Sequence, residues 1–223
     1  MSFPFRSQRA VLVAVALALA PWGISVPSPP PAKPYRLVAG SLPKKPPKDA
    51  PAPPSTPQAT TYLKGVTVTI EYADADRRAA FLKRIDPELK DPFASPPGAV
   101  EPAIVFVVGF DNQAHGEVQF QPGNVVLISN HGDRSFPIDL TDVYLGAERA
   151  GNEDLQRVID RTTKIMFDSA TTIPAGARRA RLLAFRQLEG TKWQELQIHF
   201  SFLEIEGETH TLSFIFHKEL LAP

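Results

Sequence analysis

Residues 196–216, LQIHFSFLEIEGETHTLSFIF, decide the fold class of this chain. Apolar and polar residues alternate on both sides of Gly207, which is the pattern of two half-buried β-strands joined by a tight turn. A hairpin that turns about Gly207 pairs residues at equal distances from that glycine and gives both strands one apolar face. The residues expected to face inward are Leu196, Ile198, Phe200, Phe202, Leu212, Phe214 and Phe216.

The same period of two recurs upstream of the hairpin. Val66, Val68 and Ile70 alternate with polar residues, as in a half-buried strand. Residues 104–110 (IVFVVGF) are continuously apolar, as expected of a central strand that is buried on both sides. Further strands are predicted at residues 118–120, 125–129, 136–145 and 179–188.

Two helices are expected to interrupt the strand series. The first spans residues 74–85, where Asp74 or Asp76 can cap the helix and Ala80, Phe81 and Ile85 share a face. The second spans residues 152–166. About eight short strands with two helical insertions favour a sandwich or Greek-key barrel for residues 61–223 over an alternating βαβ arrangement.

Several turns resemble those of a bacterial immunoglobulin-like domain. They are the run 106–112 (FVVGFDN), the Pro122-Gly123 turn that follows residues 118–120, and the turn 173–176 (IPAG) before residues 182–185. The resemblance implies an immunoglobulin-like sandwich in which a buried strand ends at an Asn turn. It also implies a binding or scaffolding role, because members of this class are typically such modules.

The N-terminus has the layout of a secretory signal. Arg6 and Arg9 precede the apolar run 10–20 (AVLVAVALALA), and Pro21-Trp22-Gly23 follows it. A membrane-spanning helix needs roughly 20 apolar residues. Residues 1–26 are therefore predicted to be a cleaved signal peptide, with a retained inner-membrane anchor over residues 10–26 as the alternative.

Residues 27–60 are predicted to be a disordered, proline-rich linker. Twelve prolines lie between residues 27 and 57, and proline supports neither helices nor strand ladders, whereas it suits the polyproline II conformation. Such a linker can hold residues 61–223 away from a membrane. We expect a periplasmic or cell-surface protein that touches a membrane only through an uncleaved N-terminal segment.

Composition excludes several classes of function. The chain contains no cysteine, so it forms no disulfide and has no thiolate chemistry. Residues 1–60 contain seven Lys or Arg and one acidic residue, a net charge of +6, which leaves −6 on residues 61–223. A negatively charged folded part argues against nucleic acid as a partner, because phosphate binding needs a basic surface. Another envelope protein is the expected partner.

The outward side of the last hairpin is the first candidate interaction surface. Pairing about Gly207 places His199 opposite Ile215 and makes His217 its diagonal neighbour. Leu203 and Ile215 are apolar residues expected to point outward, and exposed apolar patches tend to mark interfaces. This hairpin face comprises His199, Ser201, Leu203, Thr211, Ser213, Ile215 and His217. The alternative is that the helix at residues 152–166 covers it.

A second candidate surface is the basic cluster Arg178, Arg179 and Arg181, the alternative being a charged strand entry. No hydrolase, P-loop or dinucleotide motif occurs. We therefore predict a non-enzymatic envelope protein with no cofactor, metal site or catalytic residue. The alternatives are a hydrolase or transferase that uses Asp139, Asp142 and Asp168, or a metal carrier that uses His199 and His217.

Overall fold

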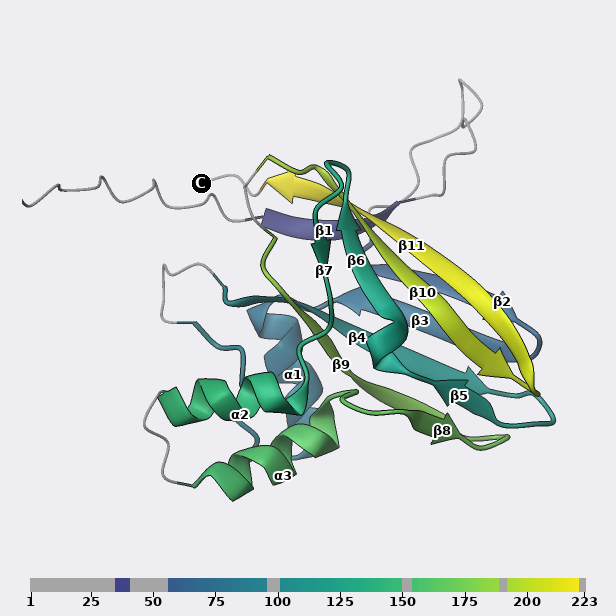
Figure 1. The fold of residues 1–223 in the computed structure, drawn as a ribbon, viewed down its shortest axis with the longest axis horizontal. Coiled ribbons are helices and arrows are strands. Elements are labelled where there is room, and N and C mark those ends of the chain that lie inside the picture. Colours follow the sequence, from purple (N-terminus) through teal and green to yellow (C-terminus); the bar gives the residue numbers. More distant parts are fainter. Residues whose placement is uncertain (1–34, 41–55, 96–100, 150–153, 189–191, 221–223) are drawn as a thin grey trace, which may run out of the picture. The chain divides into compact units, whose positions relative to one another are not determined.

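The structure is a computed structural model that describes residues 35–40, 56–95, 101–149, 154–188 and 192–220. All of these residues lie in one compact unit, residues 31–223. Two antiparallel sheets pack face to face, and helices lie against one of them (Figure 1). The predicted mainly β sandwich is confirmed. The signal or anchor at residues 1–26 lies outside the described residues.

The smaller sheet has the strand order β2-β3-β4-β9. Its strands are β2 (Gln58–Leu63), β3 (Val66–Tyr72), β4 (Ala103–Asn112) and β9 (Arg178–Arg186). Alternation along β4 divides its side chains between two environments. Ile104, Phe106 and Val108 face the other sheet, whereas Ala103 and Val105 face the helices. This double burial explains why residues 104–110 are apolar without interruption.

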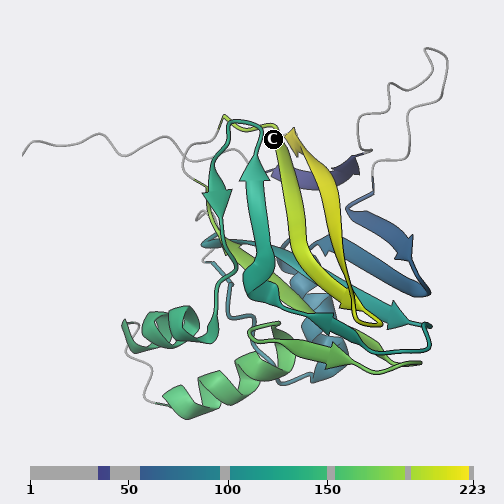
Figure 2. The same ribbon diagram turned by 45° about the vertical axis from the view of Figure 1, so that its right-hand side comes forward.

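The larger sheet is built around the hairpin of β10 (Glu195–Ile205) and β11 (Glu208–Leu220). Strand β1 (Tyr35–Gly40) pairs with β11. On the other side, β10 pairs with both β5 (Val118–Phe120) and β6 (Val125–Ser129), which the short 3-10 helix η1 (Pro122–Asn124) connects (Figure 2). The short strands β7 (Arg134–Ser135) and β8 (Thr171–Ile173) pair with β6 and β5.

The main core fills the space between the sheets and is rich in phenylalanine. Phe106 of β4 and Phe216 of β11 meet across the sandwich with ring centroids 5.1 Å apart. Phe110 of β4 and Phe120 of β5 do the same at 5.0 Å. Offset and edge-to-face ring contacts of this kind add to the hydrophobic gain from burial, so the two sheets are held together along their length.

In the part of the chain that the structure describes, three helices, not the two predicted, form a layer on the outer side of the smaller sheet. They are α1 (Ala75–Ile85), α2 (Leu140–Arg149) and α3 (Leu155–Ile165). With β4 and β9 they bury a second apolar cluster that includes Phe81, Phe93, Val105, Ile165, Met166 and Leu182. Within the described ranges, no helix has the length and apolar character needed to cross a membrane.

The boundaries of α1 agree with the prediction, but its buried face does not. The Asp74 carboxylate accepts a hydrogen bond from the Arg77 backbone N–H at 3.0 Å and caps the helix. Arg78, Phe81 and Leu82 are its buried residues, whereas Ala80 and Ile85 are exposed. The buried face therefore includes an arginine, which a search for apolar residues at helical spacing does not find.

The strand predicted at residues 136–145 is wrong, because α2 begins within it. Asp139 and Asp142 form a reciprocal cap at the start of this helix. The Asp142 backbone N–H donates to the Asp139 carboxylate at 2.9 Å, and the Asp139 N–H donates to the Asp142 carboxylate at 3.5 Å. The second predicted helix is confirmed as α3, with Asp154 accepting a hydrogen bond from the Arg157 N–H.

The last hairpin is confirmed, but its predicted register is wrong. Glu206 and Gly207 both have positive φ and form a two-residue turn, so the strands pair Ile205 with Glu208. A bulge between Phe200 and Leu203 shifts the register once more. Consequently Leu203 enters the main core in the place that the alternation gave to Phe202, which is only half-buried.

The disordered linker predicted for residues 27–60 is corrected at Tyr35–Gly40. These residues form β1, where Leu37 is buried in the main core and Val38 is also buried. The Ala39 N–H donates to the Thr56 carbonyl at 2.6 Å, and β2 already begins at Gln58. Although prolines flank this segment, its six residues are long enough to pair with β11 and form an edge strand of the larger sheet.

The free edge of β9 is covered over half of its length. The Phe167 N–H donates to the Leu182 carbonyl at 2.9 Å, and the Ile138 N–H donates to the Ala184 carbonyl at 2.7 Å. The Ser135 hydroxyl donates to the Arg186 carbonyl at 3.0 Å. The segments that enter α2 and leave α3 are thereby fixed to the smaller sheet, so the helical layer is part of the sandwich.

Candidate ligand cavity

The structure does not bring His199 and His217 together. His199 lies opposite Ser213, not Ile215, and its Nδ1 is 2.9 Å from the Ser213 hydroxyl oxygen. His217 lies opposite Glu195, so the two histidines are separated by four residues along the hairpin, about 13 Å at the rise of a strand. In the described part of the chain, no group of three or more histidine or carboxylate side chains is placed to hold a metal ion.

The two apolar residues that were expected to be exposed on the hairpin face, Leu203 and Ile215, are buried. Leu203 is completely buried in the main core because the bulge turns it inward, and Ile215 is also buried. Ser201, Thr211 and His217 are exposed, whereas His199 and Ser213 are half-buried. The helix expected as a possible cover, α3, packs instead against β9 of the other sheet (Figure 1). What remains is a polar strand surface.

The three arginines of the basic cluster point to two sides of β9. Arg178 faces outward and forms an ion pair with Asp111 at 2.8 Å. Arg181 lies on the opposite side, 5.9 Å from the centre of the Phe167 ring, and donates to the Met166 carbonyl at 3.3 Å. Burial and the charge of Arg179 lower the pKa of Arg181. Arg181 therefore packs against the edge of the sandwich, Arg179 is exposed beside it, and neither forms one surface with Arg178.

The carboxylates of the hydrolase hypothesis do not converge. Asp139 and Asp142 are occupied at the start of α2, and Asp142 also forms an ion pair with Arg186 of β9. Of the three residues, Asp142 alone belongs to the lining of the two cavities described below. Asp139 and Asp142 both bind backbone N–H groups at the start of α2, and neither Asp139 nor Asp168 lines a cavity with Asp142, so the three carboxylates do not share one of these pockets.

A cavity of about 750 Å³ lies between α2, α3 and the segment 90–93. This volume falls in the range of sites that hold small molecules, roughly 300–1,000 Å³. Its apolar lining comes from separate parts of the chain and includes Phe93, Ala103, Ile138, Val143, Leu145, Val158 and Ile165. Its charged lining is Lys90, Asp91, Asp142, Arg149, Arg161 and Arg186.

Incomplete packing of α2 creates this cavity. No residue of α2 is fully buried, and Val143 packs only partly against the second apolar cluster. By contrast, α3 buries Thr162 and Ile165 completely or nearly so, and the Thr162 hydroxyl donates to the Val158 carbonyl at 2.8 Å. One wall of the cavity is thus α3, which is packed firmly against the fold. Another wall is α2, whose apolar side is only partly buried.

A third wall, formed by the segment 90–93, is held in place by Arg78, whose side chain is completely buried. Its Nε donates to the Asp91 carboxylate at 2.8 Å, and Nη1 donates to Glu101 at 2.6 Å and to the Ala73 carbonyl at 3.0 Å. Nη2 donates to Glu101 at 3.2 Å. Since Asp91 and its neighbour Phe93 both line the cavity, this buried arginine positions the wall from behind.

The charges that remain unpaired in the lining are positive. Asp91 is paired with Arg78, which it shares with Glu101, and Asp142 is paired with Arg186. Within the described residues, the side chains of Lys90, Arg149 and Arg161 form neither an ion pair nor a hydrogen bond. The cavity therefore combines an apolar floor with three cationic side chains available to a ligand.

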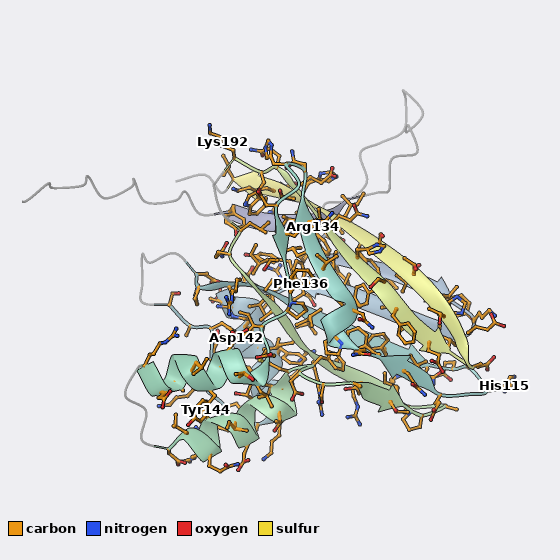
Figure 3. All side chains as sticks on the ribbon, viewed as in Figure 1. His115, Arg134, Phe136, Asp142, Tyr144 and Lys192 are labelled. Atoms are coloured by element: carbon orange, nitrogen blue, oxygen red, sulfur yellow. The ribbon has the colours of Figure 1, made fainter. Side chains whose placement is uncertain are left out.

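A second, smaller cavity of about 500 Å³ adjoins the first. Asp142 and Arg186 belong to the lining of both, so their ion pair separates the two hollows. Phe136, which is 63% exposed, lies in this second lining together with Arg134. Figure 3 shows Arg134, Phe136 and Asp142 along the segment that leads from β7 into α2.

None of the cationic lining residues was singled out from the sequence. Lys90, Arg149 and Arg161 are isolated charges in segments far apart in the chain, and no local pattern joins them. The one local signal available was the pair Asp139 and Asp142, three residues apart, which marks the start of a helix. Recognising α2 would have shown that the smaller sheet carries a helical layer.

Comparison with known proteins identifies no family. No protein-family model matches the chain, and no curated protein matches it. Among solved structures, the YjhA protein from Bacillus subtilis is similar at 8% identity, with 64% of this chain and 77% of that chain covered and a TM-score of 0.35. A likeness at this level supports no conclusion about this chain.

Proposed function

We propose that this chain is an exported, non-enzymatic binding module of the cell envelope, with its ligand held in the cavity between α2, α3 and the smaller sheet. The observation that carries the proposal is the cavity itself. Helices that only covered the outer face of the smaller sheet would need no hollow of about 750 Å³. An immunoglobulin-like scaffold, implied by the turns at residues 106–112 and 173–176, is part of the same proposal.

Export is supported by the N-terminal sequence. Arg6, Arg9 and the apolar run 10–20 have the order that secretory signals require. The prolines between residues 27 and 57 suit a spacer on either side of β1. In this proposal, the partner is another envelope protein that delivers the ligand or receives it.

Export is tested by fusing alkaline phosphatase to the C-terminus of the full chain. We expect enzyme activity in intact cells, and we expect a Leu17→Arg variant, which interrupts the apolar run, to lose it. Equal activity of the two fusions, or recovery of the unmodified chain solely from cytosol, would overturn the location. N-terminal sequencing of the mature protein then separates a cleaved signal from a retained anchor.

Ligand binding is tested by native mass spectrometry of the full chain purified from its envelope fraction without detergent. We expect an adduct of small-molecule mass that disappears on mild denaturation. Protein of bare polypeptide mass, together with no small molecule in an organic extract, would overturn the binding role.

A further inference from the structure

The geometry points to a single-chain amphiphile with an anionic head group, a carboxylate or a phosphate, as the occupant of this cavity. The inference rests on the proposed function, since it names the ligand class of the same site. The apolar chain would lie against the half-buried Ile138, Val143 and Val158, and the head group would be bound by Lys90, Arg149 and Arg161.

The apolar floor requires a ligand with a hydrocarbon part. Phe93, Ala103 and Ile165 belong to the buried cluster beneath the helices, and the half-buried Ile138, Val143 and Val158 extend it toward α2 and α3. Bare phosphate or acetate would leave this surface unused. Phe93, Ala103 and Ile165 are already buried by the fold, so an acyl or alkyl chain would remove from water the remaining exposed surface of Ile138, Val143 and Val158. Such burial is the usual driving force for binding in these sites.

The charge of the lining requires a negative head group. A cation in the last turn of a helix complements the helix dipole, and this alone would account for Arg149. It does not account for Arg161, which lies within α3, half-buried and lining the cavity. A guanidinium group binds carboxylates and phosphates through two parallel hydrogen bonds, so Arg161 is the residue best suited to the head group.

Gly146 of α2 marks a position where the size of the cavity can be changed. It lies inside α2, where glycine is less favourable than alanine, and it lines the cavity. A Cβ placed on Gly146 would meet no atom within 4 Å, and the residue does not have the positive φ that would demand glycine. Gly146 is exposed, so a larger side chain can be introduced at this border of the cavity without a clash in the unliganded fold.

Charge also argues against the chain's own N-terminal segment as the occupant. Residues 1–60 carry a net charge of +6, which a cavity with three unpaired cations would repel. A neutral lipid would satisfy the apolar floor and leave the cations unused. An anionic amphiphile satisfies both parts of the lining.

Isothermal titration of the delipidated full chain tests the inference with dodecanoate, dodecyl phosphate, neutral dodecyl maltoside and acetate, each below its critical micelle concentration. We expect both anionic amphiphiles to bind, the neutral one to bind at least about tenfold more weakly, and acetate not to bind. The ratio between dodecanoate and dodecyl phosphate distinguishes a fatty-acid ligand from a phospholipid-derived one. Equal binding of the neutral amphiphile would overturn the inference.

Three variants locate the binding. Arg161→Gln should weaken dodecanoate binding by about tenfold, whereas Lys164→Gln, which removes a charge from the same helix outside the cavity lining, should leave it unchanged. Gly146→Leu should abolish binding by filling the space. Circular dichroism and the melting temperature establish that each variant is folded. Equal losses in Arg161→Gln and Lys164→Gln, or full binding by Gly146→Leu, would place the amphiphile elsewhere.

Two further outcomes separate this inference from the proposed function. A native mass spectrum that shows a small molecule without an anionic group overturns the inference and leaves the binding role intact. The second outcome is a chain that binds no free dodecanoate but floats with vesicles containing phosphatidylglycerol. If Gly146→Leu does not change this flotation, the partner is a membrane surface. That result also overturns the inference.

Discussion

Arg78, completely buried at the inner face of α1, donates its Nε hydrogen to Asp91 at 2.8 Å. The same guanidinium holds Glu101, so one side chain ties a helix to two otherwise separate segments. Asp91 retains 12% and Glu101 30% of side-chain exposure, which makes this a largely desolvated ion network. Removing one partner from such a network leaves buried charges without compensation.

Arg78→Ala is therefore expected to lower the free energy of unfolding by about 3–5 kcal/mol. Lys83→Ala, on the exposed side of the same helix, should change it by less than about 0.5 kcal/mol. Denaturant titration followed by circular dichroism measures both. A loss below 1 kcal/mol in Arg78→Ala would show that the ion network contributes little beyond local packing.

Tyr72 makes stability sensitive to alkaline pH. The residue is 6% exposed, and burial, with smaller contributions from Tyr35 and Glu101, raises its pKa well above the ordinary value of about 10. The folded state therefore keeps the phenol neutral, while the unfolded chain ionises it. The resulting stabilisation is complete below about pH 10 and is lost as the pH rises above it.

Stability should accordingly decline between about pH 10 and pH 12, and Tyr72→Phe should make this decline shallower. Tyr62→Phe is the matched control, because Tyr62 is 71% exposed and its phenol is in contact with solvent in both states. Thermal melts across this pH range provide the measurement. Parallel pH profiles for the wild-type chain and Tyr72→Phe would contradict the assignment.

Gly207 sets the turn of the last hairpin. Its φ of 79° lies in the left-handed region, which costs a residue with a Cβ roughly 1–2 kcal/mol. Gly207→Ala should therefore lower stability by about 1 kcal/mol or more. Gly123→Ala should be nearly neutral, because φ at Gly123 is not positive and a Cβ there meets no atom within 4 Å. Equal effects of the two substitutions in chemical denaturation would argue against the observed turn.

Gly146→Ala tests the space beneath α2 without reference to any ligand. Alanine is favoured over glycine inside a helix by about 0.5–1 kcal/mol, and the added Cβ enters open space. The variant should be more stable than the wild-type chain by about that amount. A decrease in melting temperature would mean that a Cβ at position 146 meets neighbouring atoms, contrary to the open space found there.

The strand pattern was predictable because burial imposes a period that the sequence records. Residues 118–120 and 125–129 are strands as predicted, and the apolar run 104–110 lies within β4. Strand β1 was missed because a short apolar segment, Leu37 and Val38, stands among prolines. Its pairing depends on β11, some 180 residues away, and no local pattern contains that information.

The register of the last hairpin failed for a different reason. Alternation around Gly207 gives the correct strands, but the bulge between Phe200 and Leu203 exchanges the environments of Phe202 and Leu203. The bulge lies where β10 passes from pairing with β6 to pairing with β5, and the Ser201 hydroxyl donates to the Asn124 carbonyl at 2.6 Å there. The cavity was beyond prediction because its lining comes from distant segments whose approach only the tertiary fold determines.

The pairing of Tyr35 with Leu220 at the edge of the larger sheet has a practical consequence. Because the first and last described strands meet there, a short peptide could join them and the chain could be reopened at an exposed turn such as Gly123. Such a circular permutant would present the sandwich, the helices and the cavity without the export segment attached to β1. Comparing the permutant with the full chain would thus separate the role of the N-terminal export segment from ligand binding by the sandwich and its helices.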